Sequence, residues 1–115
     1  METVGYSNSI VLKVTAVDNQ LTAYLNPDIP NGQKTAEVYS RYVSGFSTPV
    51  NDTIDLTPTL AGLGGSATFA AIASNFVGGG AMAFELVADG STVYKQNTSL
   101  PEYTSQQWAV SIQKR

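Results

Sequence analysis

An alternation of apolar and polar residues with a period of two restricts the fold of this chain more than any other feature. It is clearest over Ser9–Val17, where Ile10, Leu12, Val14 and Ala16 share one side of an extended chain. Residues that alternate in this way place one face of a β-strand in a core and the other in solvent. Ser9–Val17 is therefore predicted to be a half-buried strand.

Residue pairs that favour tight turns divide the chain into short segments of this kind. Asp18-Asn19 tolerates left-handed backbone angles, and Asp89-Gly90 is a strong signal for a two-residue hairpin turn. A loop is expected at 27–32, where two prolines and an Asn-Gly pair stand close together. Further strands are predicted over 21–25, 34–43, 50–56, 82–88, 92–96 and 107–113.

The same alternation predicts which side of each segment faces the core. In the 34–43 segment Ala36, Val38 and Tyr42 alternate with polar residues, so these three are expected to point inward. If these three residues point inward, Tyr39 lies on the polar side of the strand as an exposed aromatic residue. The inward rows expected elsewhere are Leu21, Ala23 and Leu25; Ile54 and Leu56; Met82, Phe84, Leu86 and Ala88; and Trp108, Val110 and Ile112.

The stretch from Leu56 through Phe84 contains no charged residue and is rich in glycine and alanine. Within it, residues 66–77 are compatible with two structures. The pattern over Ser66–Ala73 favours a strand, whereas apolar residues at a spacing of three and four also fit one face of a helix. Strand is the preferred prediction.

These segments together predict an all-β fold. Seven or eight short strands at even spacing, without alternating helices, are typical of a single-domain antiparallel β-sandwich or a small barrel. At most one short helix is expected, over 57–63, because Pro58 suits the first turn of a helix. A chain of 115 residues has the length of one domain, so one sandwich domain is predicted over 1–115.

The chain contains neither histidine nor cysteine, so the commonest general base, the commonest transition-metal ligand and the thiol nucleophile are all missing. Asp52 and Asp55 could pair for glycoside hydrolysis or, with Asn51, bind calcium, but turn capping is the preferred role. We therefore expect a protein that is not an enzyme, with no catalytic, cofactor-binding or metal-binding residues and no cofactor.

Charge also restricts the choice of partner. Charged residues make up 13% of the chain and the net charge is -3, with lysines and arginines scattered rather than clustered. No basic stripe is available for a phosphate backbone, so nucleic acid is not an expected partner. The sequence shows no apolar run of membrane-spanning length and no secretory signal. We expect no membrane span, synthesis in the cytoplasm, and assembly into a virion or other released particle.

Two surface features indicate contact with a partner. The uncharged stretch suits an interface between subunits, because obligate interfaces are depleted in charge. Aromatic residues on polar strand faces instead suit stacking on sugar rings. The candidate interface residues are Leu60, Leu63, Phe69, Ile72, Phe76 and Val77. The candidate sugar-stacking residues are Tyr39, Tyr94, Tyr103 and Trp108.

The expected function is accordingly structural and non-enzymatic. The chain would form a homo-oligomer, or pack against another structural protein, in a symmetric assembly such as a virion, a capsid surface or a fibre. A small lectin-like sandwich that binds carbohydrate is the first alternative. Membrane insertion by Ser66–Val77, in the manner of a small pore-forming protein, is the second.

Overall fold

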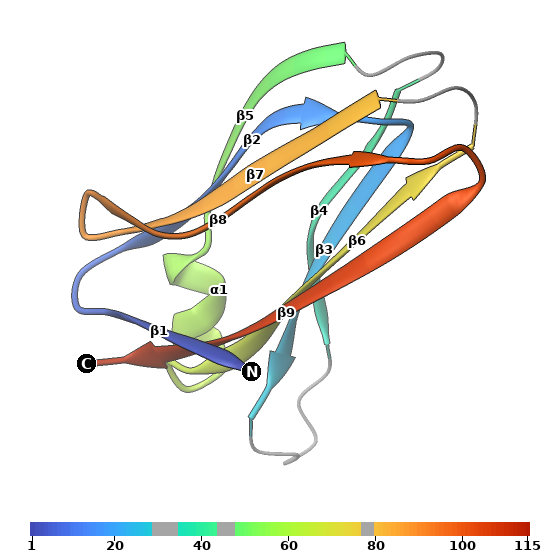
Figure 1. Ribbon diagram of the computed structural model, residues 1–115. Helices are drawn as coiled ribbons and strands as arrows, with labels where there is room; N and C mark the ends of the chain where they lie inside the picture. The colour runs from blue at the N-terminus through green and yellow to red at the C-terminus, as the bar shows by residue number, and fades with distance from the viewer. Residues whose placement is uncertain (29–34, 44–47, 77–79) are drawn as a thin grey trace.

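The computed structural model describes residues 1–28, 35–43, 48–76 and 80–115, and within them the chain forms two β-sheets packed face to face (Figure 1). The elements in these ranges are β1 (Glu2–Tyr6), β2 (Ile10–Val17), β3 (Gln20–Pro27), β4 (Ala36–Tyr42), β5 (Thr48–Asp55), α1 (Thr57–Gly62), β6 (Ala67–Asn75), β7 (Gly80–Ala88), β8 (Ser91–Leu100) and β9 (Thr104–Lys114). The β-sandwich prediction is confirmed. The described ranges contain nine strands instead of seven or eight, because the sequence pattern did not reveal β1.

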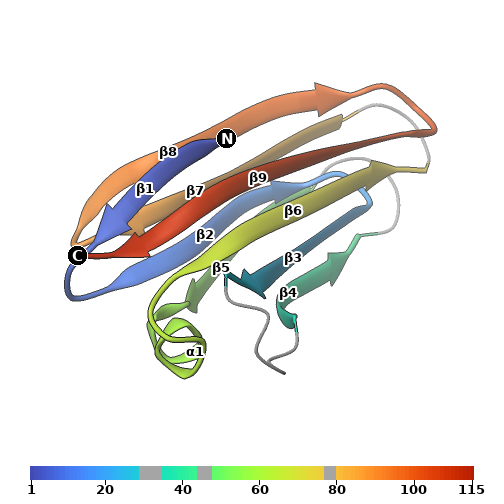
Figure 2. The same ribbon diagram turned by 90° about the horizontal axis from the view of Figure 1, so that it is seen from below.

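The strands divide into a five-stranded and a four-stranded sheet. The five-stranded sheet has the order β1-β9-β6-β3-β4, and the four-stranded sheet has the order β5-β2-β7-β8. Every neighbouring pair is antiparallel except β1 and β9, which run parallel. Seen from below, β9, β6, β3 and β4 lie side by side in one layer (Figure 2).

Strand β1 is too short to give a clear alternation, since it contributes only Val4 and Tyr6 to the core. Its position comes from long-range contacts. Val4 pairs with Ile112 in the parallel ladder, and the Tyr6 hydroxyl donates a hydrogen bond of 2.6 Å to the carbonyl of Gly65. Burial raises the pKa of Tyr6 above its ordinary value.

The choice of strand over helix for residues 66–77 is confirmed in the described part of that range. Every second residue of β6 from Ala67 to Asn75 is buried, and the intervening residues are half-buried. The strand pairs with β3 on one side and β9 on the other. A small alanine-rich inner face fits here because the larger buried side chains of β7, Met82, Phe84 and Leu86, fill the space between the sheets.

The ring of Phe84 on β7 occupies the centre of the core. Its centroid lies 6.0 Å from that of Phe69, 6.1 Å from that of Tyr94 and 5.6 Å from that of Trp108. Phe69 and Trp108 belong to the opposite sheet, so this aromatic cluster joins the two layers. Tilted and edge-to-face pairs at these distances add to the free energy gained from burial.

Two shifts in strand register explain where the predicted orientations are wrong. A shift between Val14 and Ala16 leaves Ala16 half-buried and turns Val17 into the core. A second shift in the β3–β4 ladder places Tyr39 opposite the buried Ala23. Because one extra residue reverses the side on which all later residues lie, Tyr39 points inward and Tyr42 outward, the reverse of the prediction.

The expected short helix is present as α1, and it lies at one end of the sandwich (Figure 1). Pro58 stands in its first turn, and Leu60 is fully buried. The Thr57 hydroxyl accepts a hydrogen bond from the amide of Ile10 at 2.9 Å, which ties the helix start to β2. No helix in the described residues is long and apolar enough to span a membrane.

The two predicted hairpin turns also form, with positive φ angles of 63° at Asn19 and 52° at Asp89.

The Asp89 carboxylate has a further role, because it accepts hydrogen bonds from three consecutive backbone amides. These come from Ser7 at 2.8 Å, Asn8 at 2.7 Å and Ser9 at 3.1 Å. The amides, with Asn8 first, hold the pKa of Asp89 below its ordinary value. The β7–β8 turn thereby fixes the link between β1 and β2. Of the loop predicted at 27–32, Pro27 is the last residue of β3, and residues 29–32 lie outside the described residues.

Replacing Asp89 by asparagine tests the three hydrogen bonds to its carboxylate, because asparagine tolerates the same backbone angle but lacks the charge. The lowered pKa means that the stabilisation is complete above the ordinary pKa of aspartate and is lost as the pH falls through the folded value. We expect Asp89→Asn to be less stable than the wild type at neutral pH, with the difference disappearing in strong acid. Urea unfolding across this pH range measures it, and a difference independent of pH would contradict the prediction.

Candidate functional site

The outer faces of the two sheets differ in charge. On the four-stranded sheet, Lys13, Glu85 and Lys95 stand opposite one another on β2, β7 and β8. Opposite charges on neighbouring strands stabilise a solvent-exposed sheet face. This side of the sandwich therefore has the composition of a surface in contact with water.

The outer face of the five-stranded sheet has no charged residue on its three inner strands, β3, β6 and β9. We call this surface the uncharged face. Its members alternate along each strand with the buried residues of the core. They are Gln20, Thr22, Tyr24, Asn26, Thr68, Ala70, Ile72, Ser74, Ser105, Gln107, Ala109, Ser111 and Gln113.

Small residues make the middle of the uncharged face flat. Ala70 stands between Tyr24 and Ala109, and Ile72 stands between Thr22 and Gln107. Ala70 and Ile72 are both half-buried, and they lie on the side of β6 opposite to its core residues. An isoleucine among alanines offers apolar contact area at low cost in side-chain entropy.

The charged groups near the uncharged face lie at its border. Asp28 follows β3 and accepts hydrogen bonds from Thr68 at 3.5 Å and from Gln113 at 3.3 Å. Glu37 is exposed on the edge strand β4. The Arg115 guanidinium lies against Gly5 on the other edge strand, β1. The face is thus a charge-free area with a charged rim.

A pocket lies at the end of this face where β6 ends and β9 begins. It has a volume of about 280 Å³ and is lined by Ser74, Asn75, Phe76, Tyr103, Thr104 and Ser105. Ser74 and Ser105 are paired directly across the two strands. Tyr103 is 81% exposed and Phe76 is 44% exposed, so two aromatic side chains stand at the pocket with much of their surface in solvent.

Hydrogen bonds from buried amides hold the walls of the pocket. The Asn75 side chain donates to the carbonyl of Leu100 at 2.7 Å. The Asn19 side chain accepts from the amide of Phe76 at 2.6 Å and donates to the carbonyl of Val43 at 3.0 Å. The β2–β3 turn therefore fixes the position of Phe76.

Asp18, beside Asn19 in the same turn, is fully buried. Neither oxygen of its carboxylate has a hydrogen-bond partner among the described residues. Burial raises the pKa of Asp18 above its ordinary value, because desolvation disfavours the charged form. The turn that supports the pocket thus carries a destabilising group.

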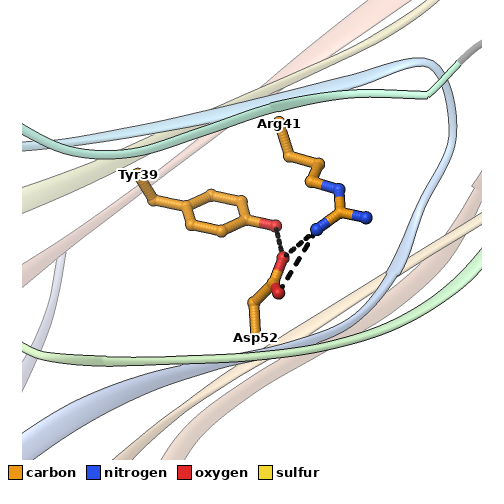
Figure 3. Close-up of polar contacts among 3 residues, drawn as sticks. All are labelled: Tyr39, Arg41 and Asp52. Carbon is orange, nitrogen blue, oxygen red and sulfur yellow. Dashed lines mark hydrogen bonds and ion pairs between the residues drawn. The ribbon is translucent and has the colours of Figure 1, made fainter.

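A separate polar cluster closes the edge of the sandwich between β4 and β5 (Figure 3). The Tyr39 hydroxyl donates to the Asp52 carboxylate at 2.6 Å, and the Arg41 guanidinium pairs with the same carboxylate at 3.1 Å. Burial raises the pKa of Tyr39, and the bond to Asp52 raises it further. We call these three residues the edge bridge. It joins the two sheets, and its groups already contact one another.

The six residues predicted to form an interface are not brought together. Leu60 and Phe69 lie in the core, because α1 and β6 turn them between the sheets, so they are unavailable on the surface. Leu63 is half-buried and packs on the core. Ile72 lies on the uncharged face and Phe76 beside the pocket. Val77 lies outside the described residues.

Of the four residues predicted to stack on sugars, only Tyr103 stands free in solvent. Tyr39 belongs to the edge bridge. Trp108 is buried and Tyr94 half-buried, and both contact Phe84. Trp108 lies on the inward row that the alternation predicts, and the register shift in the β3–β4 ladder turns Tyr39 inward. These rings are therefore not presented on the described surface.

The acidic candidates serve structural roles. Asp55 accepts a hydrogen bond from the amide of Thr57 at 3.0 Å, which agrees with the capping role, and Asp52 belongs to the edge bridge. No group of three or more metal-binding side chains gathers among the described residues. No protein-family model, no curated protein and no solved structure matches this chain.

Sequence reasoning missed four members of the pocket, Ser74, Asn75, Thr104 and Ser105. Residues of these types are common in this chain, and only the register of β6 against β9 brings them together. It also missed the buried state of Asp18, because an Asp-Asn pair normally indicates an exposed turn.

Replacing Asp52 by alanine tests the edge bridge. We expect a loss of about 1–3 kcal/mol, because the partly buried Tyr39 hydroxyl is left without its acceptor. Arg41→Ala should cost less, about 0–1 kcal/mol, since exposed ion pairs contribute little. Chemical denaturation of both variants measures which of them loses more free energy of unfolding. Equal losses would show that the tyrosine bond does not hold this edge.

Replacing Asp18 by asparagine tests the buried carboxylate. A raised pKa means that the destabilisation is complete above the folded value and disappears as the pH falls below the ordinary pKa of aspartate. We expect Asp18→Asn to stabilise the protein at neutral pH by roughly 1 kcal/mol, with no gain in acid. Thermal unfolding at several pH values measures this, and a loss of stability at neutral pH would contradict it.

Proposed function

We propose that the protein is a non-enzymatic structural subunit that packs against a neighbour through the uncharged face. The observation that carries this proposal is the contrast between the two outer faces of the sandwich. One has lysine and glutamate at its centre, and the other has alanine and isoleucine there. The cores of protein interfaces are depleted in charge, which fits the second face and not the first.

The size of the uncharged face supports the same proposal. Strand β6 has nine residues, which corresponds to about 30 Å at about 3.3 Å per residue. The three strands of the uncharged face at about 4.8 Å spacing give a width of about 14 Å, and hence an area of about 430 Å². The edge strands β1 and β4 widen the surface to about 24 Å, which gives about 700 Å² with the charged rim included. A stable interface buries about 800 Å² on each partner. The uncharged face therefore supplies about half of the area that one neighbour requires, and together with its charged rim it comes close to the whole.

The border of the face suits a second copy of the same chain as the neighbour. Acidic Glu37 lies at one edge strand and basic Arg115 at the other. In a two-fold arrangement with the axis along the strands, the β4 edge of one copy lies over the β1 edge of the other. The acidic edge of each copy then lies over the basic edge of the other. Glu37 is level with Ala109 and Gly5 with Gln113, so Glu37 and Arg115 are offset along the strands and attract each other at long range instead of forming a direct pair. Symmetric packing of this kind is what a capsid-surface or fibre subunit would use.

The absence of an enzymatic role is part of the proposal. The described residues that line the pocket offer hydroxyl, amide and aromatic groups, and no carboxylate or amine. General acid–base catalysis needs a titratable pair within reach of the substrate. Membrane insertion by Ser66–Val77 is not proposed, because β6 would have to leave both β3 and β9.

Two matched lysine variants test the proposed interface. Ile72 and Val87 are both β-branched, half-buried and outward-facing on an inner strand, but of opposite sheets. We expect the wild type to self-associate with rising concentration and Ile72→Lys to weaken this by about 100-fold, since an unpaired charge would be buried. Val87→Lys should associate like the wild type. Sedimentation analysis measures all three.

The proposal fails if the wild-type chain remains monomeric at the highest concentration at which it dissolves. It also fails if both lysine variants weaken association equally, because the contact would then not depend on the uncharged face. Circular dichroism and thermal unfolding of each variant show whether the sandwich is intact.

A further inference from the structure

The pocket at the end of β6 and β9 has the chemistry of a ligand site. Its two aromatic side chains come from different segments, Phe76 after β6 and Tyr103 before β9. Tyr103 is largely exposed, and Phe76 keeps 44% of its surface in solvent. Large exposed rings cost solvation free energy unless something covers them. A flat ligand between or against these rings would do so.

The remaining lining groups are hydrogen-bonding and neutral. The hydroxyls of Ser74 and Ser105 stand on directly opposed residues and make no hydrogen bond with the described residues. The Thr104 hydroxyl donates to the carbonyl of Pro101 at 2.5 Å, which leaves its oxygen able to accept. Such a lining favours a neutral ligand with several hydroxyl groups over an ion.

The backbone at Tyr103 gives an independent reason to expect a ligand here. Its φ angle is 62°, in the left-handed region. The other two described non-glycine residues with positive φ, Asn19 and Asp89, are of types that tolerate this conformation, whereas a tyrosine does so at a cost. Its side chain is 81% exposed, so the core gains nothing from it. Strained residues of this kind concentrate at functional sites.

We propose that this pocket binds one ring of a neutral carbohydrate, with Tyr103 and Phe76 against the faces of the sugar and Ser74, Thr104 and Ser105 bonding its hydroxyls. The volume of about 280 Å³ lies at the lower end of the range for small-molecule sites, which fits a single ring. Aromatic faces stack on the C–H faces of sugars while hydroxyl groups select their orientation. The inference is argued from the pocket alone, although the pocket shares Ser74 and Ser105 with the uncharged face.

Titration with monosaccharides, followed by amide chemical shifts, tests the proposal on the whole chain. The probes are glucose, galactose, mannose and N-acetylglucosamine, with glucuronate as a charged analogue and phenol as an aromatic one. We expect at least one neutral sugar to shift the amides of residues 74–76 and 103–105 with millimolar affinity. Glucuronate and phenol should bind more weakly.

Substitutions separate binding from folding. Tyr103→Gly removes the ring and relieves the backbone strain, so we expect an unchanged or higher thermal midpoint together with loss of sugar binding. Phe76→Ala should weaken binding at least about fivefold. Tyr42, which is 63% exposed on β4 and does not line the pocket, provides the matched control, and Tyr42→Ala should bind normally.

Three results would overturn the proposal. None of the four neutral sugars shifts these amides in the wild type, or the shifts persist unchanged in Tyr103→Gly, or phenol binds the pocket in preference to every sugar. The titration is made at a protein concentration at which the chain is monomeric, because the pocket shares Ser74 and Ser105 with the uncharged face. Under that condition each outcome concerns the pocket alone and leaves the interface proposal unaffected.

Discussion

Contact between the inner faces of the two sheets, centred on Phe84, is the interaction on which the rest of the structure depends. The chain has no cysteine, so no disulfide joins the layers. Phe84 contacts aromatic rings of both β6 and β9. The edge bridge joins β4 to β5, and the Asp89 carboxylate binds the segment between β1 and β2. Because packing holds the sandwich, its outer faces are free to differ, and they do: one is charged at its centre and the other is not.

The sequence predicts the parts of the fold that follow from alternation alone. For β7 and β9 the period of two is unbroken, and it predicts both the strand and its buried side. Strands β2 and β6 and the Asp89-Gly90 turn were also predicted, but in β2 the predicted orientation holds only as far as Val14. Where a register shift occurs, as before Tyr39, the pattern predicts the strand correctly but assigns the wrong residues to its buried side. Strand β1 has too few residues for any pattern, and only its pairing with β9 defines it.

The candidate site was harder to predict than the fold, and for a physical reason. Tyr103 was named as a surface aromatic, and Ile72 and Phe76 as contact residues, but their partners come from the pairing of β6 with β9. A sequence shows which residues share a strand face and not which strand lies beside it. The uncharged face likewise becomes visible only when β3, β6 and β9 are placed next to one another.

The parallel pairing of β1 with β9 has a consequence for how the protein reaches this structure. Tyr6 and Lys114 are ladder partners although almost the whole chain separates them. Closing so long a loop costs conformational entropy, and this cost is offset only after the contacts between β1 and β9 have formed. Strand β1 therefore has no partner in the sheet, and its inward residues Val4 and Tyr6 lack their neighbours on β9, until residues 104–114 have been synthesised. Folding of this sandwich should be slow for its size, and its nascent form should be the state most at risk of aggregation.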